Sequence, residues 1–400
     1  MIPEIIELNS KAREEGKLYG KKRFVYMQIK KHLAERAFIA IIGPRGAGKT
    51  IMLKQLLLEN KDSFYISLDT EKPEEGLYGV AKDLAERGTK ILLLDEVHGY
   101  PGFQKELKKI YDFLPSINVV FTSSSAIALH EASVDLSRRV RIIRSPPFSL
   151  REFIYFERNE ELPSLSMEHL INWKSAKEYY GENIHAESLF DRYLKGRNYP
   201  FTIGKTDFMP LFRSILETII NNDLVIKERV SLEESLEIRR MLTFIGKSFA
   251  EGISYSSIAE NCGITKYKSE KYVSLLEKAF VLRPVLPKGT NVTKEPKILI
   301  APPYRLLYRD FDDCIGAIRE DFFADAMINL GFSVNYLKSM RGEKIPDYIT
   351  DDTIFEIGGT SKSVSQFKGF DAKKKIILTH PGMIDEIRRP LFFIGMLEAK

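Results

Sequence analysis

The residues most suited to chemistry lie near the start of the chain, from Gly43 to Thr50. They read Gly-Pro-Arg-Gly-Ala-Gly-Lys-Thr and fit the pattern G-x-x-x-x-G-K-[ST] at every fixed position. Glycines at this spacing let backbone N–H groups converge on phosphate oxygens. Lys49 supplies a cation for the β- and γ-phosphates, and the Thr50 hydroxyl can ligate Mg²⁺. The pattern therefore predicts a site for ATP or ADP with Mg²⁺, formed by Gly43, Pro44, Arg45, Gly46, Ala47, Gly48, Lys49, Thr50 and Ile51.

A pair of carboxylates, Asp95 and Glu96, follows the apolar run Ile91–Leu94. Ligands bind beyond the carboxyl ends of parallel strands, so Asp95 is placed to hold the Mg²⁺ shell. The Glu96 side chain points the other way and can polarise the attacking water as a general base. A solvated loop start is the alternative, but the position downstream of a complete phosphate loop favours catalysis. The guanine-reading Asn-Lys-x-Asp motif of GTPases is absent, since Asn60-Lys61-Asp62 lacks the spacer residue.

Two further groups could act on the same nucleotide. Thr122 and Ser124 stand at the end of a third apolar run and could sense the γ-phosphate or orient water. A serine-rich helix N-cap explains them equally well. Arg139, which follows Arg138, could stabilise charge in the transition state, either in the same chain or from a neighbouring subunit. A surface cluster of basic residues is the alternative for this arginine.

These residues require a parallel sheet to hold them, and the pattern of residues 37–150 predicts one. Short apolar strands alternate with amphipathic helices, which is typical of βαβ units. The expected strands are 38–42, 64–68, 91–94 and 119–122, and the expected helices are 50–58, 78–86 and 103–113. Residues 1–36 read as a charged, helical N-terminal arm.

The composition limits the classes of protein that fit. A chain of 400 residues, 44% hydrophobic and 29% charged, is ordinary for a soluble protein of two to four domains. The net charge of +5 permits nucleic-acid contact without arguing for it. Two cysteines are too few for a disulfide framework and favour a reducing cytosol. No signal peptide or membrane-spanning run is apparent, so we expect a cytoplasmic protein with no membrane partner.

Residues 254–278 fit a helix-turn-helix, with Gly263 at the turn. The second of these helices carries Lys266, Lys268 and Lys271, which we expect on an exposed face together with two tyrosines, Tyr267 and Tyr272. Such a face could enter a DNA groove or hold phosphates. A winged helix that packs on the ATPase core or on a partner protein is the alternative.

The chain resembles the archaeal-type AAA+ ATPases, also widespread in bacteria, that carry an uncharacterised C-terminal region. The resemblance spans roughly residues 37–370 and rests, beyond the phosphate loop and the acidic pair, on Leu94–Phe103, Leu107–Asp112, Thr122–Ser125, Pro147–Glu152, Tyr193–Pro200 and Ile219–Asp223. It implies a helical lid after the core and a winged helix beyond the lid. Of the two adjacent arginines, only Arg139 carries over to the family pattern.

Family members resemble PD-(D/E)XK nucleases in their C-terminal domain, which implies a second metal site here. Asp347 and Glu356 could be the ligands, and Glu320 could complete the set. Gly358 stands where the lysine of the E-x-K motif is expected, so we predict a domain that binds without cleaving. Residues that could supply a migrated lysine function are Lys362, Gln366 and Lys368.

The sequence thus predicts an α/β fold with a P-loop AAA+ parallel-sheet core at 1–150, a helical lid at 151–231, a winged helix at 232–294 and a nuclease-like α/β domain at 295–400. The main hypothesis is an ATP-hydrolysing switch that acts on nucleic acid or on a partner protein, with a homo-oligomer left open. An ATP-regulated DNA nuclease and an ATP-binding signalling or assembly scaffold are the alternatives.

Overall fold

The structure is a computed structural model that describes residues 3–35, 37–69, 73, 75–124, 139–249, 252–289, 295–337, 345–362, 367 and 374–400. The chain divides into two compact units, residues 1–147 and residues 148–400. Across the described ranges, no helix is both long enough and apolar enough to cross a membrane.

The first unit is built on a five-stranded parallel sheet with the order β2-β3-β4-β1-β5. Its strands are β1 (Phe38–Ile42), β2 (Ser63–Ser67), β3 (Ile91–Asp95), β4 (Asn118–Ser123) and β5 (Val140–Arg144). The expected α/β fold with a parallel sheet is therefore confirmed. The sequence pattern did not predict strand β5. Its charged and branched residues form a largely exposed edge strand and not an apolar run.

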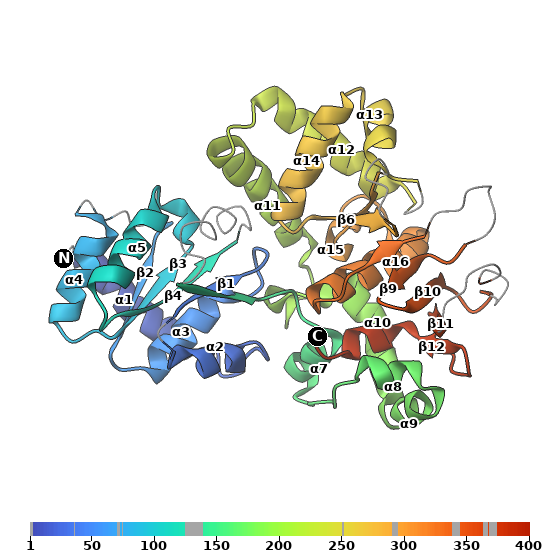
Figure 1. Ribbon diagram of the computed structural model, residues 1–400, viewed down its shortest axis with the longest axis horizontal. Helices are drawn as coiled ribbons and strands as arrows, with labels where there is room; N and C mark the ends of the chain where they lie inside the picture. Colours follow the sequence, from blue (N-terminus) through green and yellow to red (C-terminus); the bar gives the residue numbers. More distant parts are fainter. Residues whose placement is uncertain are drawn as a thin grey trace. The chain divides into compact units, whose positions relative to one another are not determined.

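Helices cover both faces of this sheet (Figure 1). They are α1 (Pro3–Gly16), α2 (Tyr26–Leu33), α3 (Lys49–Glu59), α4 (Gly76–Glu86) and α5 (Phe103–Phe113). Apolar residues of α1, α2 and α3 share one core with one face of the sheet, while α4 packs against α5. The N-terminal arm is helical as expected, and it also protects the edge strand β2, where the Tyr65 N–H donates to Asn9 Oδ1 at 2.9 Å.

The second unit contains a seven-stranded sheet with the order β12-β11-β10-β9-β8-β6-β7. Its strands are β6 (Leu282–Pro287), β7 (Lys297–Ile300), β8 (Asn335–Tyr336), β9 (Tyr348–Thr350), β10 (Thr353–Gly358), β11 (Lys374–Thr379) and β12 (Arg388–Pro390). Its helices include α7 (Leu150–Arg158), α8 (Met167–Ile171), α9 (Trp173–Asn183), α10 (Glu187–Arg192), α11 (Met209–Thr218), α12 (Leu232–Lys247), α13 (Tyr255–Cys262), α14 (Lys266–Lys278), α15 (Pro302–Arg305) and α16 (Phe311–Asn329).

One hydrophobic core joins the early and late parts of the second unit. It combines residues of α7 to α10 with residues of α16, of β10 and β11, and of the segment 391–397. Strand β6, which follows the three helices α12 to α14, pairs both with β7 and with β8. The expected boundaries at residues 231 and 294 therefore fall inside one packed unit.

Candidate nucleotide site at the carboxyl edge of the parallel sheet

The phosphate loop joins the end of β1 to the start of α3. Gly46 and Gly48 have φ values of 81° and 83°, a left-handed conformation that glycine adopts without a Cβ penalty. Lys49 is buried, and its ammonium group donates to Gly43 O and Pro44 O, both at 2.9 Å. The loop therefore has the glycine geometry and the cation that the sequence predicted, at the positive end of a helix.

Gly43 is needed for a reason other than approach to phosphate. A Cβ at this position would lie 1.9 Å from Ser145 O, which is far inside van der Waals contact. The Ser145 N–H also donates to Ile42 O at 2.6 Å. The first glycine of the loop therefore makes room for the backbone that follows β5.

Asp95 ends β3 at the same edge of the sheet and is almost fully buried. Its two carboxylate oxygens accept hydrogen bonds from the Thr122 hydroxyl at 2.5 Å and from the Tyr65 hydroxyl at 2.9 Å. Burial and the neighbouring Glu96 charge raise the pKa of Asp95, while hydrogen bonds from Thr122, Thr50 and Tyr65 act in the opposite direction. Thr50 and Asp95, the two predicted Mg²⁺ ligands, are thus in contact.

Glu96 follows directly, in the left-handed region with φ of 52°. Its backbone N–H donates to Thr122 Oγ1 at 2.9 Å, so one hydroxyl holds both acidic residues. Its carboxylate Oε2 lies 3.0 Å from His98 Nδ1 and accepts from the Ser124 N–H at 3.2 Å. The Ser124 hydroxyl lies 3.4 Å from the other ring nitrogen of His98.

The charge state of Glu96 is set by its neighbours. Burial alone would raise the pKa of Glu96, but the hydrogen bond from His98 and the positive charges of Lys49 and Arg45 outweigh it. This pKa is therefore held well below its usual range, and Glu96 is ionised at neutral pH. An ionised carboxylate can accept a proton from water, as a general base must.

The site residues fit a hard divalent cation. The Thr50 hydroxyl and the Asp95 carboxylate are oxygen donors, and Mg²⁺ prefers oxygen ligands with several waters retained. Within the described part of the chain, no group of three or more His, Cys, Asp and Glu side chains encloses a metal position. Two protein ligands supplemented by phosphate oxygens is the usual arrangement for Mg²⁺ with a nucleotide.

Arg139 lies at the amino ends of the strands, opposite the carboxyl ends where the phosphate loop and the acidic pair lie. Strands β1 and β5 run in parallel, with Phe38 beside Val140 and Ile42 beside Arg144. Arg139 therefore precedes β5 next to the start of β1, while the phosphate loop follows the end of β1. Its guanidinium pairs with Asp112 at 3.1 Å. The length of β1 separates Arg139 from the phosphate loop of the same chain, so the structure does not support a contact between Arg139 and a nucleotide bound there. A role of Arg139 in a neighbouring subunit stays a prediction. Arg138 lies outside the described residues.

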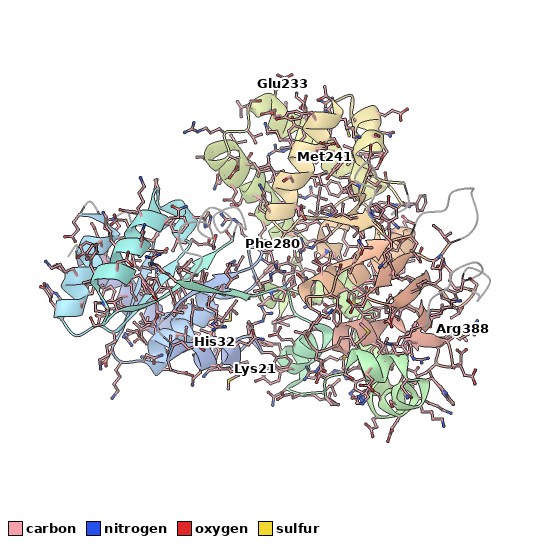
Figure 2. The ribbon with its side chains drawn as sticks, in the orientation of Figure 1. Lys21, His32, Glu233, Met241, Phe280 and Arg388 are labelled. Carbon is pink, nitrogen blue, oxygen red and sulfur yellow. The ribbon has the colours of Figure 1, made fainter. Side chains whose placement is uncertain are left out.

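The three lysines of α14 are engaged inside their own unit. Their ammonium groups pair with carboxylates at 2.7, 2.9 and 2.6 Å, in the pairs Lys266–Glu295, Lys268–Glu237 and Lys271–Glu234. Glu234 and Glu237 belong to α12, which Figure 2 marks with Glu233 and Met241. Tyr272 is fully buried and donates its hydroxyl to Glu237. Of the residues expected on an exposed face, Tyr272 is buried and Lys268 and Lys271 pair with α12, whereas Lys266 and Tyr267 are exposed, Tyr267 at 75%. Contact of this helix with DNA stays a prediction.

The second predicted site shows a feature that the sequence obscured. Lys362 passes over Gly358, where a Cβ would lie 2.6 Å from Lys362 Cε, and its ammonium group contacts the Glu356 carboxylate. A lysine side chain therefore reaches Glu356 even though position 358 is glycine. Asp347 accepts from the Ile357 N–H at 2.7 Å, beside Glu356 on β10. The other two residues considered for a migrated function, Gln366 and Lys368, lie outside the described residues.

The carboxylates of this second site repel one another. Burial and the charges of Glu320 and Glu356 raise the pKa of Asp347 to about 8. Glu356 is fully buried, and its Oε2 has no hydrogen-bond partner within the described part of the chain. Glu320 pairs with Lys297 at 2.5 Å and accepts a hydrogen bond from the Tyr348 hydroxyl at 2.7 Å.

The phosphate loop, the acidic pair and the parallel sheet together define a P-loop ATPase core. Residues 35–154 match the family model described as an AAA domain, and residues 199–301 match a domain of unknown function. The chain thus has an AAA-type ATPase domain, which confirms the resemblance to archaeal-type AAA+ ATPases. It is also 28% identical over 391 residues to the uncharacterized protein MJ1637 of Methanocaldococcus jannaschii, covering 86% of this chain and 82% of that protein.

Two solved structures also show some similarity to this chain. The Walker-type ATPase of Pyrococcus abyssi is 15% identical, covers 73% of this chain and 97% of its own, and has a TM-score of 0.44. AMPPCP-bound DnaA from Aquifex aeolicus is 16% identical, covers 66% and 90%, and has a TM-score of 0.28.

Sequence reasoning gave no role to three residues of the nucleotide site. His98 stands two residues after Glu96, and this short spacing could have indicated a contact between the two side chains. Tyr65 and Arg23 carried no signal, because their contacts with Asp95 and with the phosphate loop depend on the order of the strands and on the path of the N-terminal arm.

Proposed function

We propose that this protein hydrolyses ATP with Mg²⁺ at the edge of the parallel sheet and that its nucleotide state controls what residues 148–400 bind. The observation that carries the proposal is the convergence of two carboxylates on one hydroxyl. Thr122 joins Asp95, in contact with Thr50, to Glu96, in contact with His98. This arrangement supports Asp95 as a metal ligand next to Glu96 as a general base.

Each group then has a distinct task. Lys49 and the loop N–H groups would bind the phosphates, and Thr50 and Asp95 would hold Mg²⁺, which would offset the charge that develops on the phosphates. Glu96 accepts a proton from the attacking water. The contacts of Glu96 with His98 and with the Ser124 N–H fix the direction of its carboxylate.

ATP turnover by the purified protein tests the proposal, with and without Mg²⁺ and with single- or double-stranded DNA over a salt series. Mg²⁺-dependent turnover supports the proposal, and stimulation by DNA identifies nucleic acid as the partner. ATP binding without turnover would instead support the scaffold alternative. Since the α14 lysines are paired, we favour a protein partner over DNA at this helix.

A second candidate function, metal-dependent cleavage of phosphodiesters, is favoured by Lys362. The E-x-K pattern has glycine at position 358 in place of lysine, and the contact of Lys362 with Glu356 supplies a cation near that position. Asp347 and Glu356 supply two oxygen ligands, and Mg²⁺ commonly binds through one or two carboxylates together with substrate phosphates. A base or cation near the attacking water completes the requirement for in-line attack.

The second candidate is tested by incubating the protein with linear and supercoiled DNA in Mg²⁺ or Mn²⁺. Cleavage that is lost in both Asp347→Ala and Lys362→Ala supports it, with Lys374→Ala as a matched lysine control at the start of β11. Cleavage that survives in Asp347→Ala would exclude this site as its source.

A further inference from the structure

Arg23 links the N-terminal arm to the phosphate loop and is almost completely buried, with 5% of its surface exposed. It belongs to the segment between α1 and α2 that Figure 2 marks with Lys21. The Gln55 side chain on α3 donates to the carbonyl oxygens of Tyr19 and Lys21, each at 2.9 Å. The path of the chain up to Arg23 is therefore fixed against the helix that follows the loop.

The Arg23 guanidinium donates to two backbone carbonyls, Ala47 O at 2.5 Å and Pro146 O at 2.9 Å. The Ala47 carbonyl shares a peptide unit with the Gly48 N–H. In a planar trans peptide, these two groups point in opposite directions. By holding the carbonyl on the outside of the loop, Arg23 turns the Gly48 N–H toward the inside, where phosphate oxygens are expected.

The second carbonyl that Arg23 contacts, Pro146 O, belongs to the segment that leaves the first unit. Pro146 and Pro147 end the first unit, and residue 148 begins the second. The backbone N–H of the preceding Ser145 donates a hydrogen bond to Ile42 O, and the Ser145 carbonyl packs against Gly43. The exit segment, residues 145–147, is therefore tied to the start of the phosphate loop through Gly43 and to its middle through Arg23.

We propose that Arg23 is a positioning residue that preorganises the phosphate loop and couples its conformation to the exit segment. The inference rests on the proposed ATP site. An arginine suits this task because its planar guanidinium offers several N–H donors and stays charged at physiological pH. Nucleotide binding at the loop should then change the protection of the exit segment, and this change should require Arg23.

The test compares Arg23→Gln and Arg23→Lys with Arg13→Gln. Arg13 is a matched control, since it also belongs to the arm and donates to two carbonyls, Leu57 O at 2.7 Å and Ser63 O at 2.8 Å, but at the far end of α3. The measurements are titration with a fluorescent ATP analogue and amide exchange of a peptide covering residues 140–150, with and without nucleotide. Thermal unfolding of each variant checks that it is folded.

We expect Arg23→Gln to weaken nucleotide binding about tenfold or more, because loss of a charged hydrogen bond frees a phosphate-binding peptide. It should also abolish the nucleotide-dependent protection of residues 140–150. Arg13→Gln should bind within about twofold of the wild type, since it does not touch the loop. Arg23→Lys keeps one cation and should fall between them, and it carries the test if Arg23→Gln does not fold.

The outcomes separate this inference from the proposed function. A wild-type protein that binds no nucleotide would refute the ATP site itself. Wild-type binding with equal affinity in the Arg23 variants would overturn the positioning role alone. Weakened binding with the protection of residues 140–150 retained would overturn the coupling to the exit segment.

Discussion

Replacement of Thr122 by valine should damage the nucleotide site and the stability of the core at once. Thr122 is fully buried, and its hydroxyl accepts the Glu96 N–H and donates to the Asp95 carboxylate. Valine has nearly the same shape but no hydroxyl, so Thr122→Val removes both hydrogen bonds without creating a large cavity. Each acidic residue then loses the hydrogen bond that fixes it beside the other.

The size of the effect follows from these two bonds. A hydrogen bond to a charged group contributes about 1.5–3 kcal/mol, and an unpaired buried N–H costs about 1–3 kcal/mol. Partial relaxation leaves an expected loss of about 2–5 kcal/mol in the free energy of unfolding. For a domain of this size the Tm should fall by about 5–15 °C. Turnover should fall about tenfold or more, because Asp95 and Glu96 are no longer held together.

Thr122→Ser is the matched control, since serine keeps the hydroxyl and loses only a methyl group. It should cost about 1 kcal/mol and leave turnover near that of the wild type. Urea unfolding and ATP turnover of the two variants give the comparison. Equal stability and equal turnover in Thr122→Val and Thr122→Ser would show that the hydroxyl does not organise the acidic pair.

Three further predictions concern Arg139, the three lysines of α14 and Asp347. Arg139→Ala should leave the turnover of dilute protein within about twofold of the wild type; a large loss at high dilution would contradict the strand register. Alanine at Lys266, Lys268 and Lys271 together should lower the free energy of unfolding but leave the salt slope of any DNA binding unchanged, whereas removal of a lysine that binds a DNA phosphate would reduce that slope by about 0.9. Asp347 keeps a proton in the folded state up to pH about 8, while the unfolded chain loses it near about pH 4. The free energy of unfolding should therefore fall as the pH rises from about 4 to 8, and urea unfolding of Asp347→Asn should show a weaker dependence over that window.

The nucleotide site was largely predictable because its residues belong to short motifs that directly follow apolar runs. The loop from Gly43 to Lys49 and the pair Asp95 and Glu96 lie at strand ends whose apolar runs identify them. Parallel strands bring their carboxyl ends to one edge, so the meeting of these groups follows from local patterns alone. Whether each of these residues acts in catalysis stays a prediction.

The contacts that depend on tertiary packing were not predictable. The register that moves Arg139 to the opposite edge requires knowing that β5 pairs with β1 in parallel. The pairing of Lys268 with Glu237 requires the packing of α14 on α12. The passage of Lys362 over Gly358 depends on a turn after β10, which a fixed E-x-K spacing cannot describe.

The central claim is tested most directly by Mg²⁺-dependent ATP turnover of the wild type, Glu96→Gln and Lys49→Ala, measured beside their nucleotide affinities. We predict that Lys49→Ala loses tight ATP binding, because alanine supplies no charge at the β- and γ-phosphates. Glu96→Gln should bind ATP and Mg²⁺ like the wild type but turn over about 10²–10⁴-fold more slowly. Wild-type turnover in Glu96→Gln, with turnover lost in Asp95→Asn, would contradict the assignment of Glu96 as the general base.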